Sequence, residues 1–149
     1  MRDYLFRGKV TDDYYIKEMR GTWVEGNLVH QTEYYGMSVD KYHILYTGEF
    51  HVDYYDAATV IPETVGQFTG VLDMNGKKVF EGDIVKLTDD VKKTFDVIDG
   101  PVYFNHSAFF IKGNDGSLLA SLFALVDYTY TLRGEVIGNI YDNPELLGD

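Results

Sequence analysis

The residues best suited to chemistry are the four histidines, because the chain has no cysteine. A catalytic zinc site uses three protein ligands, often including two that are close in sequence. A turn at residues 47–48 would place His43 opposite His51 on paired strands, with Asp53 or His30 as a third ligand. Histidines on strands are more commonly solvated. We therefore predict no metal site and keep His43 and His51 as the candidates to examine.

A second place where residue types suggest chemistry is Asp73-x-Asn75-Gly76, which looks like the start of a calcium-binding loop. If Asp73 is position 1, position 5 is Lys77, where an oxygen ligand is needed. Position 12, which should be a bidentate glutamate, is Ile84. An ammonium group among the ligands does not suit a hard cation, so calcium binding is not predicted.

The same stretch is better explained by two reversals of chain direction. Asn75-Gly76 is the favoured pair for a type I′ turn, in which both central residues have positive φ. Gly82 then supplies the left-handed conformation of a second reversal, before a buried strand begins. We expect Asp83 to accept a hydrogen bond from a nearby backbone N–H. These four residues are therefore predicted to shape turns rather than to bind a substrate.

Other kinds of catalytic site find little support. The sequence lacks a Gly-x-Ser-x-Gly motif and a phosphate-binding P-loop. His106 and Ser107 are neighbours, so on a strand they would face opposite sides. The adjacent carboxylates at 12–13 and 89–90 are expected in solvated loops. We predict no catalytic residue, no cofactor-binding residue and no cofactor.

The chain is strongly acidic, with 13 basic and 24 acidic side chains and a formal net charge of −11. Proteins bind a phosphate backbone by neutralising it with Lys and Arg, so direct nucleic-acid binding is not expected. The first ten residues contain no apolar signal segment, and no run approaches the roughly 18 apolar residues that span a bilayer. We therefore expect a cytoplasmic protein without membrane contact.

The elements that position these residues are predicted to be mostly β-strands. Aromatic and β-branched residues recur between Gly, Asn and Asp, a pattern typical of strands and hairpins. Turns are expected at residues 25–27 and 47–48. The 149 residues divide into a Tyr-rich β-hairpin lobe at 1–60 and a glycine-punctuated part at 61–149.

Helical structure is predicted at one place, a single short C-terminal turn. Asn143 would be its N-cap, Pro144 its first residue and Gly148 its end. Residues 117–128 (Ser117–Tyr128) fit either a strand or a helix, and the sequence does not decide between them.

Tyrosine is abundant, with 13 residues in the chain, and an acid precedes a Tyr-Tyr pair three times. Neighbouring side chains on a strand point to opposite faces, so one ring of each pair would join the core and the other would face outward. Tyrosine supplies large contact area with little loss of rotamer freedom. The candidates for an interface with a protein partner or a second copy are Tyr14, Tyr15, Tyr34, Tyr35, Tyr54 and Tyr55.

Several motifs together resemble the YopX family of phage and prophage proteins. They are the segments at 1–7 (MRDYLFR), 65–70 (VGQFTG), 73–77 (DMNGK), 80–85 (FEGDIV) and 135–147 (EVIGNIYDNPELL). The resemblance covers nearly the whole chain and is weaker between residues 20 and 60. It implies a mostly β protein with an SH3-like barrel in its second half. One continuous domain over 1–149 is the alternative to the division at residues 60–61. The resemblance also implies a phage or prophage origin, and no biochemical activity.

The leading functional interpretation is a non-enzymatic protein that acts through protein contacts or self-association. One alternative is an acidic DNA mimic that targets a host DNA-binding protein, which the net charge of −11 motivates. Two rows of carboxylates at phosphate-like spacing would favour that alternative. Another alternative is a metal-dependent enzyme that uses His43 and His51.

Overall fold

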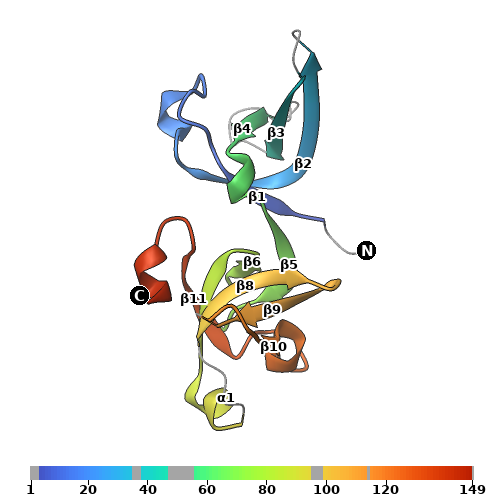
Figure 1. The fold of residues 1–149 in the computed structure, drawn as a ribbon. Coiled ribbons are helices and arrows are strands. Elements are labelled where there is room, and N and C mark those ends of the chain that lie inside the picture. The colour runs from blue at the N-terminus through green and yellow to red at the C-terminus, as the bar shows by residue number, and fades with distance from the viewer. Residues whose placement is uncertain (1–3, 35–37, 47–55, 95–98, 114, 149) are drawn as a thin grey trace. The chain divides into compact units, whose positions relative to one another are not determined.

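The computed structural model describes residues 4–34, 38–46, 56–94, 99–113 and 115–148 (Figure 1). The chain forms two compact units, Met1–Gln67 and Phe68–Asp149. The sequence predicted the division at residues 60–61. The observed division lies later because strand β5 (Gly66–Leu72) begins in the first unit, where its first two residues pair with β1 (Phe6–Lys9).

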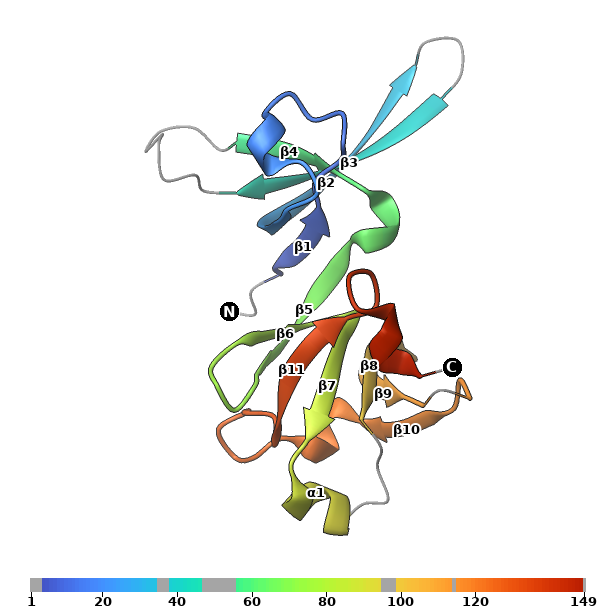
Figure 2. The same cartoon turned by 90° about the vertical axis from the view of Figure 1, so that its left-hand side faces the viewer.

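The first unit is an antiparallel sheet with the strand order β4-β3-β2-β1-β5. Its other strands are β2 (Trp23–Tyr34), β3 (Ser38–Tyr46) and β4 (Asp56–Val60). β2 and β3 pair continuously over their outer halves and form a long two-stranded ribbon (Figure 2). Two 3-10 turns, η1 (Lys17–Met19) and η2 (Pro62–Thr64), connect the strands.

The core of this unit is small and is built from strand residues together with Val10 and Tyr14, which follow β1. Its buried side chains are Val10, Tyr14, Val24, Ile44, Ala58 and Val60. The Tyr14 hydroxyl donates a hydrogen bond to the carbonyl oxygen of Ala57 at 3.1 Å, which satisfies the one polar atom of that buried ring.

The turn predicted at residues 25–27 is wrong, because β2 runs straight through them. Gly26 pairs with Phe6 on β1, and Asn27 pairs with Leu45 on β3. A Cβ atom at position 26 would overlap the carbonyl oxygen of Leu45. Glycine is therefore needed here for the close approach of two backbones rather than for a reversal of the chain.

The second unit contains a five-stranded antiparallel sheet with the order β10-β9-β8-β7-β11. β6 (Lys78–Phe80) pairs with β5 instead. The sheet strands are β7 (Asp83–Leu87), β8 (Gly100–Asn105), β9 (Ala108–Lys112), β10 (Leu118–Ser121) and β11 (Gly134–Asn139). The helical elements are α1 (Asp89–Thr94), η3 (Leu122–Leu125) and η4 (Pro144–Leu147).

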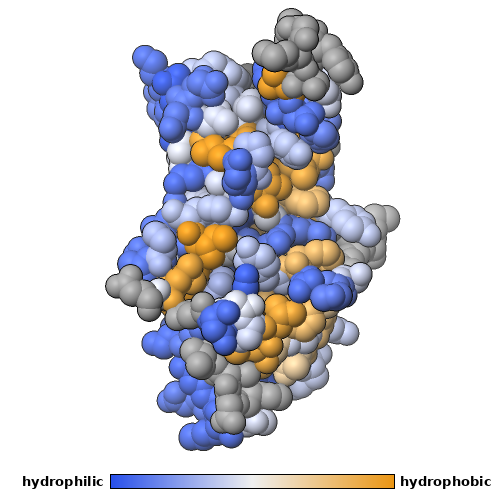
Figure 3. All heavy atoms as spheres, in the orientation of Figure 1, coloured by the Kyte–Doolittle hydropathy of each residue, from blue (hydrophilic) through white to orange (hydrophobic). Residues whose placement is uncertain are grey.

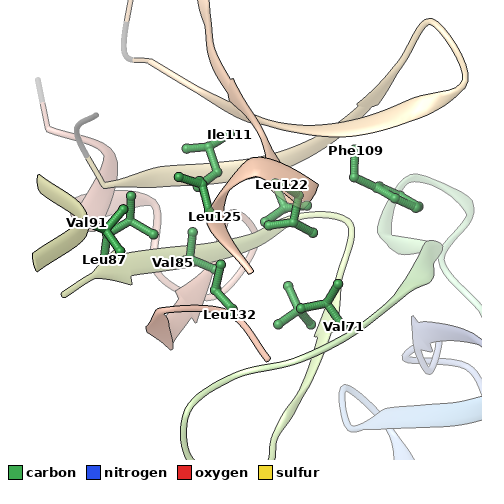
Figure 4. Packing of buried hydrophobic residues seen from close by; sticks show 11 residues of the cluster. Val71, Val85, Leu87, Val91, Phe109, Ile111, Leu122, Leu125 and Leu132 are labelled. Atoms are coloured by element: carbon green, nitrogen blue, oxygen red, sulfur yellow. The ribbon is translucent and has the colours of Figure 1, made fainter. Parts of the chain in front are cut away.

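The larger hydrophobic core belongs to this second unit. In Figure 4, side chains from the sheet point toward Leu122 and Leu125 of η3, which close one side of the cluster. Burial of each aliphatic side chain contributes about 1.5–3 kcal/mol relative to exposure, so this cluster is the main apolar source of stability. Its members are Val71, Val79, Val85, Leu87, Val91, Val102, Phe109, Ile111, Leu122, Leu125 and Leu132.

The prediction of a mostly β protein is confirmed. The SH3-like barrel stays a prediction, because no pairing of β10 with β11 closes the sheet in the described part of the chain. The prediction of a single helical turn is wrong, since α1 and three further 3-10 turns accompany the C-terminal one. Residues 117–128 contain both of the elements that fitted their sequence, β10 followed by η3.

The C-terminal turn forms as η4, with Pro144 first and Gly148 following it at a φ of 71°. Asn143 makes no side-chain capping bond to η4. Its Oδ1 instead accepts a hydrogen bond from the backbone N–H of Asn139 at 3.3 Å. The expected cap is wrong because the side chain is used to close the turn that follows β11.

Candidate functional site

His43 does not have the partner that the sequence suggested. The pairing of β3 with β2 and β4 places Val29 and Thr59 on either side of it. Its Nδ1 lies 3.2 Å from the Thr59 hydroxyl oxygen. The cross-strand pairing of His43 with His51 is therefore wrong, since Thr59 occupies that position. His51 and Asp53 themselves lie outside the described residues.

His30 faces the opposite side of the ribbon from His43, because His30 pairs with Tyr42 and His43 with the preceding residue of β2. The His30 ring stacks on Tyr42 with centroids 4.6 Å apart, and its Nε2 lies 3.2 Å from an Asp40 carboxylate oxygen. Hydrogen bonds from Thr32 and then His30 lower the pKa of Asp40. Within the residues described, no three metal-ligating side chains come together.

The stretch at 73–77 forms a hairpin turn organised by one buried carboxylate. Asp73 Oδ1 accepts hydrogen bonds from the N–H groups of Asn75 at 2.9 Å and Lys77 at 2.8 Å. Its Oδ2 accepts one from Val136 on β11 at 3.0 Å. Gly76 has a φ of 79°, whereas Asn75 does not have positive φ, so the turn is not of type I′. It is a three-residue loop closed by an Asp side chain.

The second reversal lies between β6 and β7. Gly82 has a φ of 83°, the left-handed region that favours glycine. The buried Asp83 accepts a hydrogen bond from the backbone N–H of Phe80 at 2.8 Å through its Oδ2. In both reversals, therefore, the carboxylate is directed at backbone donors.

Further carboxylates of the second unit have the same role. Asp99 accepts hydrogen bonds from the Leu87 N–H at 2.7 Å and the Lys92 ammonium at 3.1 Å. Asp115 accepts two from Ser117, through its N–H and its hydroxyl. These acidic side chains accept hydrogen bonds from nearby backbone N–H groups and do not converge on a common ligand site.

The tyrosines predicted to form an interface fall into different environments. Tyr14 is buried, whereas Tyr15 is 73% exposed and stacks in a tilted arrangement on Tyr14 with centroids 4.6 Å apart. Tyr34 ends β2, and nothing further is described of its side chain. Tyr35, Tyr54 and Tyr55 lie outside the described residues. The predicted interface remains untested.

The most exposed tyrosine of the described residues is one that sequence reasoning missed. Tyr128 is 95% exposed and Tyr130 is 64% exposed, in the loop between η3 and β11. We name residues 127–131 the tyrosine turn. The signal in the sequence is the alternation Asp-Tyr-Thr-Tyr-Thr, in which polar threonines flank each ring.

The tyrosine turn is held by one carboxylate. Asp127 Oδ1 accepts hydrogen bonds from the Thr129 N–H at 2.8 Å, the Thr129 hydroxyl at 2.6 Å and the Thr131 N–H at 3.1 Å. These bonds lower the pKa of Asp127, the Thr129 hydroxyl most of all. Tyr130 has a φ of 61°, which a bulky residue rarely adopts. The two rings are therefore projected into solvent from a fixed backbone.

Other exposed aromatic side chains of the described residues lie in both units, Tyr4 and Tyr15 in the first and Phe104 and Phe123 in the second. On the face shown in Figure 3, hydrophobic residues occur in separate areas divided by hydrophilic ones. No helix in the described residues is long and apolar enough to cross a membrane.

The fold and these sites define a mostly β protein whose acids close its turns and whose most exposed tyrosine, among the described residues, lies on one of those turns. A family model described as "YopX protein" matches residues 6–148, nearly the whole chain. The chain belongs to the YopX family. No curated protein matches it.

Proposed function

We propose that this protein acts without catalysis, through protein–protein contacts, and that the tyrosine turn is its main contact surface. The observation that carries the proposal is the near-complete exposure of Tyr128 on a backbone fixed by Asp127. Membership of the YopX family supports a phage or prophage origin, and hence a partner within a bacterial host. That partner is a host protein or a second copy of the chain.

The physical reason is the conformational entropy that a binding loop loses when it becomes ordered. A flexible loop that binds must lose conformational freedom, which opposes association. In the tyrosine turn this freedom is already restricted by the three hydrogen bonds to Asp127 Oδ1. Tyr128 and Tyr130 then bring large rings with polar tips, the type of side chain enriched at binding hot spots.

The experiment places a photo-crosslinking amino acid at position 128, and at position 4 as a matched control. Tyr4 is also an exposed tyrosine, at 67%, but lies in the first unit. We expect a discrete adduct of defined mass from position 128 in the bacterial host and none from position 4. An adduct of twice the chain mass would identify a second copy as the partner.

The captured complex is then measured with purified proteins. The double variant Tyr128→Ala and Tyr130→Ala should bind at least about 30-fold more weakly, the loss expected for a hot spot of roughly 2 kcal/mol. Asp127→Ala keeps both rings but frees the turn, so it should have an intermediate effect. Equal adducts from positions 4 and 128, or full affinity of the double variant, would show that the contact surface lies elsewhere.

A further inference from the structure

A pocket of about 370 Å³ lies in the second unit and is built by elements other than the tyrosine turn. Its volume falls in the range of small-molecule sites, roughly 300–1,000 Å³. The lining residues come from β8, β9, the loop after β9 and the C-terminal segment; they are Pro101, Tyr103, Lys112, Gly113, Gly116, Ile140, Leu147 and Gly148.

The floor of the pocket is the outer face of the β8–β9 pair. Val102 and Ile111 are paired and belong to the hydrophobic core, so their neighbours Tyr103 and Lys112 point the other way. Tyr103 pairs with Phe110, which places Lys112 diagonally across from it on this outer face. The pairing of β8 with β9 that directs Val102 and Ile111 into the core therefore also directs Tyr103 and Lys112 toward the pocket.

Lys112 gives the pocket its charge. Its Nζ lies 4.5 Å from the centroid of the Tyr103 ring, a cation–π contact. No carboxylate of the described residues pairs with this ammonium group. In a chain with a net charge of −11, a lysine that rests on an aromatic ring at a pocket and has no acidic partner among the described residues can pair with a negatively charged group from outside.

Apart from Tyr103 and Lys112, the side chains that line the pocket are aliphatic. Pro101, Ile140 and Leu147 present aliphatic surface, and the three glycines leave the rim without side chains. A ligand that fits must therefore have an apolar body with a single negative charge at one end. A phosphate dianion would find only one cation to neutralise it in an otherwise acidic protein, so monoanionic carboxylates are favoured.

We propose that this pocket binds an apolar carboxylate. The aliphatic body packs on Ile140 and Leu147, and the carboxylate accepts hydrogen bonds from the Lys112 ammonium. Such a group occurs in a free branched-chain acid and in the C-terminal residue of a protein chain. The site goes beyond the proposed contact surface and does not depend on Tyr128 or Tyr130.

The test is a titration of the ¹⁵N-labelled full chain at neutral pH, followed by amide chemical shifts. The first probe is 4-methylpentanoate, and its neutral amide is the matched control. The second probe is an acetylated Gly-Gly-Leu peptide with a free C-terminus, compared with the same peptide amidated. We expect shifts at Gly113, Gly116 and Gly148 with a dissociation constant of about 1 mM for the better acid probe.

Lys112→Met keeps the apolar stem and removes the charge, and it should weaken binding at least about tenfold. Lys93→Met, an exposed lysine on α1 outside the pocket lining, is the control and should bind normally. Tighter binding of 4-methylpentanoate would identify a free acid as the ligand class, and tighter binding of the peptide a protein C-terminus. Equal binding of acids and amides, unchanged affinity of Lys112→Met, or no shifts at the three glycines would overturn the proposal.

Discussion

Among alanine substitutions of the polar residues in the turns, Asp73→Ala is expected to lower the free energy of unfolding the most. Asp73 is 1% exposed and accepts hydrogen bonds from three backbone N–H groups. Two come from its own hairpin, and the third, from Val136, ties that hairpin to the edge strand β11. The carboxylate therefore joins segments that are 63 residues apart.

The size of the effect follows from these bonds. A hydrogen bond to a charged group is worth about 1.5–3 kcal/mol, and contributions from one carboxylate do not simply add. In the variant, the backbone N–H groups of Asn75 and Lys77 can form hydrogen bonds with water instead. The N–H of Val136, which lies on a sheet strand, is left without its hydrogen-bond acceptor. We expect a loss of about 3 kcal/mol in the free energy of unfolding, or roughly 6–12 °C in Tm for a protein of this size.

The assay is thermal and urea unfolding followed by circular dichroism, with amide hydrogen exchange at Lys77 and Val136. Trp23 lies in the first unit, so its fluorescence provides an internal reference that should change little. Asp73→Asn keeps one accepting oxygen and should lose about half as much. Asp115→Ala is the matched control, because that exposed Asp closes a turn in the same way. Equal losses from Asp73→Ala and Asp115→Ala would refute the reasoning.

Three further predictions follow from single contacts. Gly26→Ala should cost at least about 2 kcal/mol by forcing β2 away from the Leu45 carbonyl oxygen, which chemical denaturation measures. Tyr14→Phe should cost about 1 kcal/mol in the same assay, because it removes the hydrogen bond to Ala57. Asp127 has a lowered pKa in the folded state, so its stabilising contribution is present above its unfolded pKa and disappears as the pH falls through the folded value. Thr129→Val should raise that pKa toward its ordinary value in a carboxyl NMR titration, and no change would contradict the assigned cause.

The sequence predicted the class of fold well because strand signals are local. β7 and β9 are short runs of β-branched and aromatic residues bounded by Gly, Asn and Asp, and that pattern is visible without a structure. Asn75 and Gly76 were also assigned to a turn from their types alone. The turn type was not predictable, because it depends on the hydrogen bonds of Asp73, including one from a strand that is distant in sequence.

The errors share one physical cause, which is that a glycine or an asparagine has more than one use. Gly26 was assigned to a turn, but it permits a close approach of β2 to β3. Asn143 was assigned to cap η4, but it bonds back to Asn139. In each case the choice between uses is made by a neighbour in space. A single sequence does not contain that information.

The candidate site was missed for a related reason. The Tyr-Tyr pairs at 14–15, 34–35 and 54–55 stand out because they repeat, yet the exposure of each ring depends on how the folded chain places it. Tyr14 and Tyr15 show both outcomes within one pair. Tyr128 and Tyr130 carry no comparable signal, because an Asp with alternating Tyr and Thr is equally consistent with an ordinary edge strand.

What separates a binding turn from a merely structural one is where the fixed backbone directs its side chains. Asp73 and Asp127 make nearly the same set of hydrogen bonds to their own turns. Around Asp73 the resulting structure is tied into a sheet through Val136, so the carboxylate serves stability. Around Asp127 the same bonding holds two tyrosine rings in water, where they are nearly as solvated as in the unfolded chain and so contribute little to folding. We therefore propose that a partner covers these rings, and that the tyrosine turn, rather than the more regular Asp73 turn, is the place to look for function.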